Sequence, residues 1–194
     1  MSNTTTTNVD LVGEEMALNV ARSALFAALT GAFAYVSFPY PLSPAPVTLQ
    51  VLGVFLAGIV LGPVWGVVSM LLYLTVGAIG LPVFAGGGAG LGTLLGPTAG
   101  YLWSYPIAAG LIGAVVHRGT DLRDPADVSL PVIVGALVAG TVVIYALGVA
   151  GLVAIAGYEL AGAVSAGALV FVPGEVLKTA VAAAIAKSGA LPTR

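Results

Sequence analysis

The feature that most constrains this chain is a very long stretch of sequence without charge. No Asp, Glu, Lys or Arg occurs between Ser23 and Val116, and a second uncharged stretch runs from Val128 to Tyr158. A soluble domain carries about a quarter charged residues, whereas here 7% are charged and 59% are hydrophobic. Water would not solvate such a surface, but lipid would. The sequence therefore predicts an all-α integral membrane protein.

The composition also excludes several classes of protein. Six basic residues against eight acidic ones give a net charge of −2, so no broad basic face is available for nucleic acid. The chain has no cysteine, which removes disulfides, thiolate nucleophiles and cysteine-based metal sites. It also lacks an HExxH motif, a Walker A sequence and a plausible Ser/His/Asp set. We therefore expect no enzyme activity, cofactor or metal, and any energy for uphill transport would come from a partner.

Glycine and proline clusters divide the apolar sequence into lengths that suit a bilayer. A spanning helix needs roughly 20 mainly apolar residues, and the pair Gly62-Pro63 predicts a sharp turn. We expect residues 1–16 to form a disordered polar tail and residues 17–194 to form one domain, a bundle of six transmembrane helices. The six predicted helices cover residues 17–37, 48–62, 64–80, 97–117, 130–156 and 173–190.

The positive charges predict the orientation of this bundle, because short loops rich in Lys and Arg stay cytoplasmic. The loop 118–129 contains Arg118 and Arg123, and the C-terminal region contains Lys187 and Arg194. We therefore expect both termini to be cytoplasmic, in a multi-pass protein of the plasma membrane. The loops expected outside contain neither Lys nor Arg and cover residues 38–47, 81–96 and 157–172.

The most informative polar residues are Glu175 and Lys178, in the run FVPGEVLK. Pro173 suits the first turn of a helix, and the i, i+3 spacing places both charges on one helix face. Lys178 would lie about 7 Å below the helix start, at a depth where a charge must be paired or face a cavity. Two interpretations stay open. One is an intrahelical ion pair whose lysine extends to the membrane surface; the other is a ligand anchor in an outward-facing cavity.

Further candidate site residues lie around the glycine-rich segment Gly80–Gly100, which holds eight glycines. Because glycine lets backbone N–H groups approach a ligand closely, Gly86 and Gly87 could belong to a lid or an anion-binding nest. A merely flexible loop is the alternative interpretation. Other residues that could line a small cavity are Thr48, Gln50, Tyr73, Phe84, Thr98, Tyr101 and Trp103.

The first predicted helix carries alanines at steps of three and four residues, which places them on one face. Small residues allow helices to approach closely in lipid. This alanine face could therefore dock on another subunit, and packing within the same chain is an equally open interpretation. The alanines are Ala17, Ala21, Ala24, Ala28 and Ala32.

Four runs of the sequence resemble the signature runs of the BioY family, the biotin-specific substrate-binding (S) components of energy-coupling factor (ECF) transporters. The resemblance covers nearly the whole chain after the N-terminal tail. It implies a six-helix membrane protein that captures biotin from outside, in complex with a transmembrane scaffold subunit and two ABC-type ATPases. The runs are PVTLQVLG (46–53), LYLTVGAIGLPVFAGG (72–87), LGPTAGYL (95–102) and PGEVLK (173–178).

The resemblance also implies roles for individual residues. An acidic residue and a lysine near the start of the family's last helix contact the ligand, and they match Glu175 and Lys178. The acidic residue is more often aspartate in the family, so Glu175 is longer by one methylene group. The family's alanine-spaced first helix meets the scaffold subunit, which would correspond to Ala24 and Ala28 here.

The chemistry of biotin fits these residues. Its ureido ring offers two N–H donors and one carbonyl, which match an acceptor beside a cationic donor. We expect Phe84 and Tyr101 to enclose the thioether ring. The valerate carboxylate would meet amides of the glycine loop or the hydroxyl of Thr98. A stand-alone facilitator or ion-coupled carrier is the alternative function, and an intramembrane enzyme is disfavoured because no catalytic set assembles.

Overall fold

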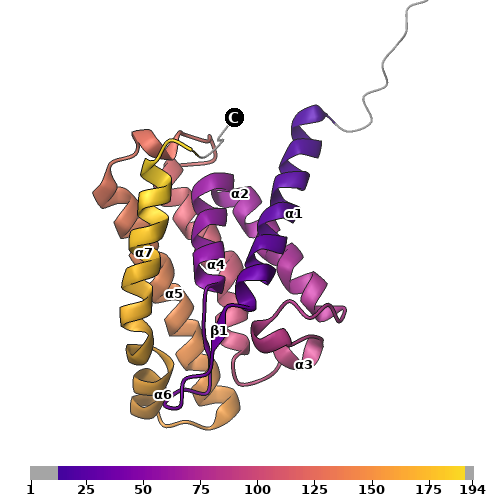
Figure 1. The fold of residues 1–194 in the computed structure, drawn as a ribbon, viewed down its shortest axis with the longest axis vertical. Helices are drawn as coiled ribbons and strands as arrows, with labels where there is room; N and C mark the ends of the chain where they lie inside the picture. The colour runs from indigo at the N-terminus through magenta and orange to yellow at the C-terminus, as the bar shows by residue number, and fades with distance from the viewer. Residues whose placement is uncertain (1–12, 191–194) are drawn as a thin grey trace, which may run out of the picture.

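The computed structural model describes residues 13–190, which form a bundle of helices (Figure 1). Within this range, five segments are long and apolar enough to cross a membrane, covering 14–34, 50–78, 99–117, 130–156 and 160–187. The prediction of a helical membrane protein is confirmed at this level. The long helices are α1 (Glu14–Ala34), α2 (Gln50–Ala78), α4 (Ala99–His117), α5 (Leu130–Ala156) and α7 (Val172–Lys187).

Short elements connect these helices. The strands β1 (Ser37–Phe38) and β2 (Val47–Thr48) pair antiparallel between α1 and α2. The glycine-rich segment contains the 3-10 turn η1 (Ala85–Gly87) and the one-turn helix α3 (Leu91–Leu94). The remaining short elements are η2 (Pro125–Asp127), α6 (Leu160–Gly167) and η3 (Leu169–Phe171).

The ends of the bundle differ slightly from the sequence prediction. Helix α1 begins at Glu14, before the expected start at residue 17, and α7 ends at Lys187. The predicted polar tail, residues 1–16, lies mostly outside the described residues, as does Arg194.

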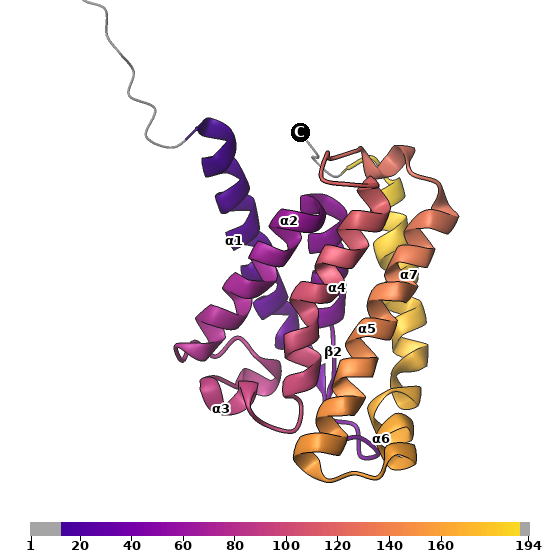
Figure 2. The same cartoon turned by 180° about the vertical axis from the view of Figure 1, so that it is seen from behind.

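Helix α2 reverses its direction in the middle. Gly62 has φ 74° and ψ −171°, which is not helical, and Pro63 has no N–H to continue the backbone ladder. Nε2 of Gln50 donates to the hydroxyl of Tyr73 at 2.6 Å, although a straight helix would separate these residues by about 35 Å. The two halves therefore run back along each other, as Figure 2 shows, and the turn predicted at Gly62-Pro63 is confirmed.

Helix α4 occupies the middle of the bundle, where it packs against α2 on one side and α5 on the other. Glycines make this close packing possible, because small residues let helix backbones approach. A Cβ atom on Gly58 of α2 would lie 2.7 Å from the carbonyl oxygen of Ala109. A Cβ atom on Gly148 of α5 would lie 2.1 Å from the ring of Tyr101. This packing fixes the rings of α4 relative to both neighbours.

The loop 118–129 lies at one end of the bundle, together with the N-terminal end of α1 and the C-terminal end of α7 (Figures 1 and 2). We call this the basic end. His117 joins the loop to α2 here, because the N–H of Arg123 donates to Nδ1 at 3.0 Å. Nε2 must then carry the proton, and it donates to the carbonyl of Ile59 at 2.9 Å. The strand pair, α3 and α6 lie at the opposite end, which we call the cavity end.

Candidate functional site

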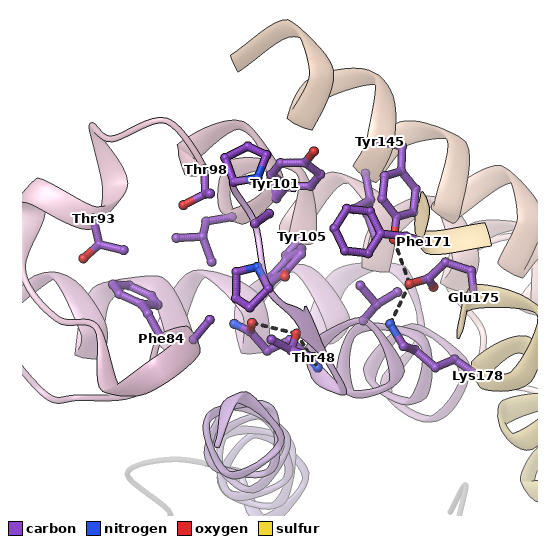
Figure 3. A pocket seen from close by; sticks show the side chains of 18 residues that line it. Thr48, Phe84, Thr93, Thr98, Tyr101, Tyr105, Tyr145, Phe171, Glu175 and Lys178 are labelled. Carbon is purple, nitrogen blue, oxygen red and sulfur yellow. Dashed lines mark hydrogen bonds and ion pairs between the residues drawn. The ribbon is translucent and has the colours of Figure 1, made fainter. Parts of the chain in front are cut away.

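A cavity of about 190 Å³ lies toward the cavity end, between α2, α4, α5, α7 and the connecting loops. Its wall is mostly apolar and aromatic, with a few polar groups, which is typical of a small-molecule site. Figure 3 shows the side chains that line it. They are Pro44, Ala45, Pro46, Thr48, Gln50, Val51, Phe84, Ala85, Thr93, Thr98, Tyr101, Leu102, Tyr105, Ile144, Tyr145, Phe171, Glu175 and Lys178.

The charged part of the wall comes from the first two turns of α7. Helix α7 begins at Val172 with a proline in its first turn, and Glu175 and Lys178 both lie on its buried face. The two residues are 4% and 6% exposed, and Nζ of Lys178 lies 2.6 Å from Oε1 of Glu175. The predicted ion pair exists, but the lysine does not extend to the membrane surface. Of the two interpretations left open by the sequence, the one in which Lys178 extends to the membrane surface is therefore wrong, because both residues lie on the buried face of α7.

One oxygen of the buried carboxylate is left without a partner. Lys178 and the hydroxyl of Tyr145 both donate to Oε1 of Glu175, at 2.6 and 2.8 Å. Over residues 13–190, Oε2 of Glu175 is the one buried side-chain nitrogen or oxygen atom that has no hydrogen-bond partner. An unsatisfied buried acceptor costs roughly 1–3 kcal/mol, and more when charged. A ligand N–H donor within reach of this oxygen would remove this cost.

Tyrosines of α4 and α5 and phenylalanines of two connecting segments form much of the rest of the wall. Tyr145 stands edge-on to Tyr101, with ring centroids 6.0 Å apart, and stacks on Phe171 at 5.7 Å. Tyr105 stacks on Tyr73 at 6.3 Å. The hydroxyl of Tyr101 donates to the carbonyl of Gly167 at 2.6 Å, which ties α4 to the end of α6. The aromatic faces offer flat apolar surface to a ring-shaped ligand.

The polar residues at the start of α2 are satisfied mainly within the chain. The hydroxyl of Thr48 donates to Oε1 of Gln50 at 2.9 Å, and Nε2 of Gln50 donates to the hydroxyl of Tyr73. Tyr73 in turn donates to the carbonyl of Val83 at 3.0 Å and is only 1% exposed. Gln50 lines the cavity, while Tyr73 lies behind it. This chain of bonds holds the loop after α2 against the start of the same helix.

The glycines predicted as ligand contacts shape a turn instead of lining the wall. Gly86 and Gly87 have φ angles of 65° and 78°, and nothing lies within 4 Å of where their Cβ atoms would stand. They close a turn in which Phe84 and Gly88 form a β-bridge. This turn directs Phe84 and Ala85 into the cavity. Positive φ angles, which favour glycine, account for Gly86 and Gly87 without a ligand.

The structure brings most of the predicted site residues to one place. Glu175, Lys178, Phe84, Thr98, Tyr101 and Gln50 all line the cavity, as does Thr48, whereas Gly86, Gly87 and Tyr73 do not. Trp103 points elsewhere: it is 49% exposed, and its indole N–H donates to the carbonyl of Leu94.

Sequence reasoning missed two tyrosines of the wall. Tyr105 lies one helical turn after Tyr101 and therefore on the same face of α4, a spacing that could have revealed it. Tyr145 stands alone in the apolar run of α5, and its role depends on contacts that no local pattern records. Phe171 and the prolines of the segment Pro44–Pro46 were also missed, because their place follows from how the connecting segments fold over the bundle.

The alanine face of α1 is exposed along its whole length. Ala24 and Ala28 point away from the bundle, and the buried face of α1 consists of other residues, including Ser23, Ala27 and Thr30. The interpretation that this face packs within the chain is therefore wrong. The two faces interleave at similar spacings, so the sequence alone did not tell which one is inside. The exposed alanines are Ala17, Ala21, Ala24, Ala28 and Ala32.

No group of three or more His, Asp or Glu side chains that could hold a metal ion occurs within residues 13–190. The chemistry of the charged pair in the cavity wall suits hydrogen bonding with an organic ligand. A carboxylate oxygen accepts N–H groups, and the ammonium of Lys178 donates to carbonyl or carboxylate oxygens.

Comparisons with known proteins find relatives over most of the chain. The family model described as the BioY family matches residues 3–192. The chain is 42% identical over 182 residues to the biotin transporter BioY of Rhodobacter capsulatus, covering 89% of this chain and 93% of that protein. It is 39% identical over 174 residues to a probable biotin transporter BioY of Pyrococcus horikoshii, covering 88% and 95%.

A solved structure shares the fold. It is the crystal structure of the S-component for biotin from an ECF-type ABC transporter, and the two structures superimpose with a TM-score of 0.82 at 25% sequence identity. The match covers 91% of this chain and 92% of the other.

Proposed function

This chain belongs to the BioY family, and from that premise we propose how its cavity works. The chain is a membrane-embedded biotin-binding subunit of an ECF-type importer, and its role is transport. The cavity holds biotin, with the unpartnered Oε2 of Glu175 as the principal acceptor for a ureido N–H. The observation that carries this proposal is a buried carboxylate oxygen without a partner, in the wall of a cavity that is otherwise aromatic and apolar.

The two ends of the cavity suit the two ends of biotin. Beside Glu175, the ammonium of Lys178 donates to the ureido carbonyl, since it has three N–H donors. Thr93 and Thr98 lie across the cavity from Glu175 in Figure 3. The hydroxyl of Thr98 makes no capping bond to α4, so it can donate to the valerate carboxylate. Phe84 and Tyr101 lie between these ends and enclose the thioether ring.

Titration calorimetry of the detergent-purified chain tests this binding mode. We expect stoichiometric biotin binding to the wild type, and clearly weaker binding to Lys178→Ala, because the substitution removes a donor and leaves Glu175 as an uncompensated buried charge. Lys187→Ala, on the same helix outside the cavity, is the matched control and should bind as the wild type does. A folded wild-type sample without any binding heat would refute the assignment.

We also propose that the chain crosses the membrane six times, with both termini in the cytoplasm. The reversal of α2 supports two passes from one helix, and Arg118, Arg123 and Lys187 support a cytoplasmic basic end. The chain contains no cysteine, so single cysteines can be labelled without further changes. In intact cells, Leu42→Cys should react with an impermeant maleimide and Thr120→Cys should not. The reverse pattern would contradict this orientation.

The exposed alanine face of α1 supports docking on a transmembrane scaffold subunit, which itself carries two ABC-type ATPases. Replacing Ala24 or Ala28 by Leu should reduce co-purification with such a scaffold, because the helices could no longer approach closely. Ala180→Leu, on an exposed position of α7, should leave the complex intact. In vesicles that contain this chain alone, we expect no biotin uptake; rapid uptake would favour a stand-alone carrier.

A further inference from the structure

The charged side chains of the cavity wall lie together at one end. Glu175 and Lys178 are buried and pair with each other at 2.6 Å. Apart from these two residues and Phe171, every lining residue comes from one of the two uncharged stretches of the sequence. Among the described lining residues, Lys178 is thus the one cation, and the carboxylate beside it balances its charge. The lining side chains therefore give the cavity no net charge.

The opposite end of the cavity offers neutral hydroxyl groups. Thr93 and Thr98 lie there, across from Glu175 (Figure 3), and both are partly exposed, whereas the charged pair is buried. We call this the threonine end, and it lies nearer to the protein surface than the charged end. Helix α4 starts beside Thr98 and adds the partial positive charge of a helix N-terminus, but its first N–H group, that of Ala99, already donates to the carbonyl of Gly96.

The other Lys and Arg side chains within residues 13–190 lie far from the threonine end. Arg118, Arg123 and Lys187 lie at the basic end of the bundle (Figure 1). Arg22 lines a second cavity together with Leu122, which belongs to the loop at that same end. The described part of the chain therefore brings no second cation to the biotin cavity.

A ligand carboxylate at the threonine end would gain no ion pair with the protein. Burying an ion without an opposite charge is strongly unfavourable, because the ion loses its hydration without compensation. A carboxylate can bind here if it stays near the surface, where water still reaches it. An ester or amide of the same acid carries no charge to desolvate, and its carbonyl oxygen still accepts from a hydroxyl such as that of Thr98.

We infer that this site recognises the uncharged ring system of biotin and leaves the valerate carboxylate without an ion pair at the threonine end, so that its ligands include uncharged amides and esters of biotin. This inference rests on the proposed biotin site and adds which part of the ligand determines specificity. The buried pair Glu175 and Lys178 selects the ureido ring, and the neutral end accepts a charged or an uncharged side chain. The competing arrangement, in which Lys178 binds the carboxylate, predicts a strong preference for the free acid.

Titration calorimetry with biotin and its primary amide on the detergent-purified wild type tests the inference. The two ligands have nearly the same size and differ in charge. We expect the amide to bind within about tenfold of biotin, because a neutral carbonyl replaces the charged acceptor of one hydrogen bond. Any larger loss would overturn the inference, and a carboxylate paired with Lys178 would produce a loss of roughly a hundredfold or more.

A cation placed at the threonine end should create the missing preference for the free acid. In Thr93→Lys, the ratio of biotin affinity to amide affinity should rise by roughly two- to fivefold, as expected for a partly exposed ion pair. The amide corrects for any steric effect of the longer side chain. Ser165→Lys adds the same charge on an exposed residue of α6 outside the cavity, and it should leave the ratio unchanged. An unchanged ratio in Thr93→Lys would place the valerate elsewhere and overturn the inference.

Failure of the inference and failure of the proposed function give different results. A wild type that binds no biotin refutes the proposed function. A wild type that binds biotin but loses the amide keeps the proposed function and overturns the inference alone. If Thr93→Lys does not fold, the comparison of the two ligands on the wild type decides.

Discussion

Two lysines on α7 differ in almost every respect although one helix carries both. Lys178 is 6% exposed and pairs with a carboxylate in the cavity wall. Lys187 is exposed at the basic end and donates to the backbone carbonyls of Ala126 and Val128. Backbone carbonyls at the end of a loop are fixed partners, so Lys187 fastens the loop 118–129 to α7. The carboxylate of Glu175, which pairs with Lys178, keeps one oxygen without a hydrogen bond. Lys187 thus supports the fold, whereas Lys178 belongs to the candidate site.

The two lysines also differ in the free energy that their placement costs. Burying an ion pair costs several kcal/mol per ion in desolvation, which attraction between the charges only partly offsets. An exposed lysine loses little hydration and contributes about as much as an ordinary hydrogen bond. A costly pair is retained where it has a use beyond stability, and we propose that here this use is ligand binding.

The largest expected effect follows from removing the carboxylate. Glu175→Gln should lower biotin affinity by about a hundredfold or more, because the charged acceptor is lost and Lys178 becomes an uncompensated buried cation. Calorimetry measures the change, and Glu159→Gln, on an exposed residue outside the cavity, serves as control. An affinity within threefold of the wild type would place the ligand elsewhere.

Replacing both charges at once separates stability from binding. In Glu175→Leu/Lys178→Leu, thermal unfolding in detergent should show a stability equal to the wild type or higher by about 1–4 kcal/mol, because well-packed apolar residues often replace buried pairs without loss. Biotin binding should be absent. If the double variant unfolded much more easily than the wild type, the pair would serve the fold, and the contrast with Lys187 would disappear.

Lys187→Met tests whether Lys187 stabilises the fold by holding the loop 118–129. The substitution keeps an unbranched side chain but removes the donor to the loop carbonyls, so the protein should lose about 0.5–1.5 kcal/mol of stability. Thermal unfolding reports this loss, and biotin affinity should not change. A marked loss of affinity with unchanged stability would show that Lys187, too, acts on the site.

The smallest effect is expected at the far end of the cavity from Glu175. Thr98→Val removes one hydroxyl that we assign to the valerate carboxylate, and it should weaken biotin binding by roughly tenfold at most. Biotin methyl ester, whose carboxylate charge is blocked, should bind the variant and the wild type with similar affinity. If the loss were the same for both ligands, Thr98 would act through packing of the wall.

Charge and apolar length made most of this fold predictable. The uncharged stretches located the membrane helices to within a few residues, and Gly62-Pro63 marked the reversal of α2. Glu175 and Lys178 could be predicted as a site because charges inside an apolar helix stand out and need a reason. The boundaries of 157–172 could not be predicted, since α6 and η3 are short and depend on packing against α5 and α7.

The rest of the site depends on contacts between distant residues. Tyr145 meets Glu175 across 30 positions of sequence, and no periodicity within α5 marks it. Gly86 and Gly87 were plausible ligand contacts because glycine suits both a turn and a close approach; the positive φ angles show that the turn explains them. The alanine face of α1 was visible in the sequence, whereas its direction required the neighbouring helices.

The reversal of α2 also affects the lipid around the protein. Its two halves span only about 18 and 24 Å at 1.5 Å per residue, less than the roughly 30 Å of bilayer hydrocarbon. The first half is enclosed by protein, but the second exposes Val64, Val68 and Leu71. Acyl chains beside it must compress, so that the bilayer thins locally at a modest cost per ångström of mismatch. Membranes with short or disordered acyl chains should therefore accommodate this protein best. We expect the bilayer to be thinned beside α2.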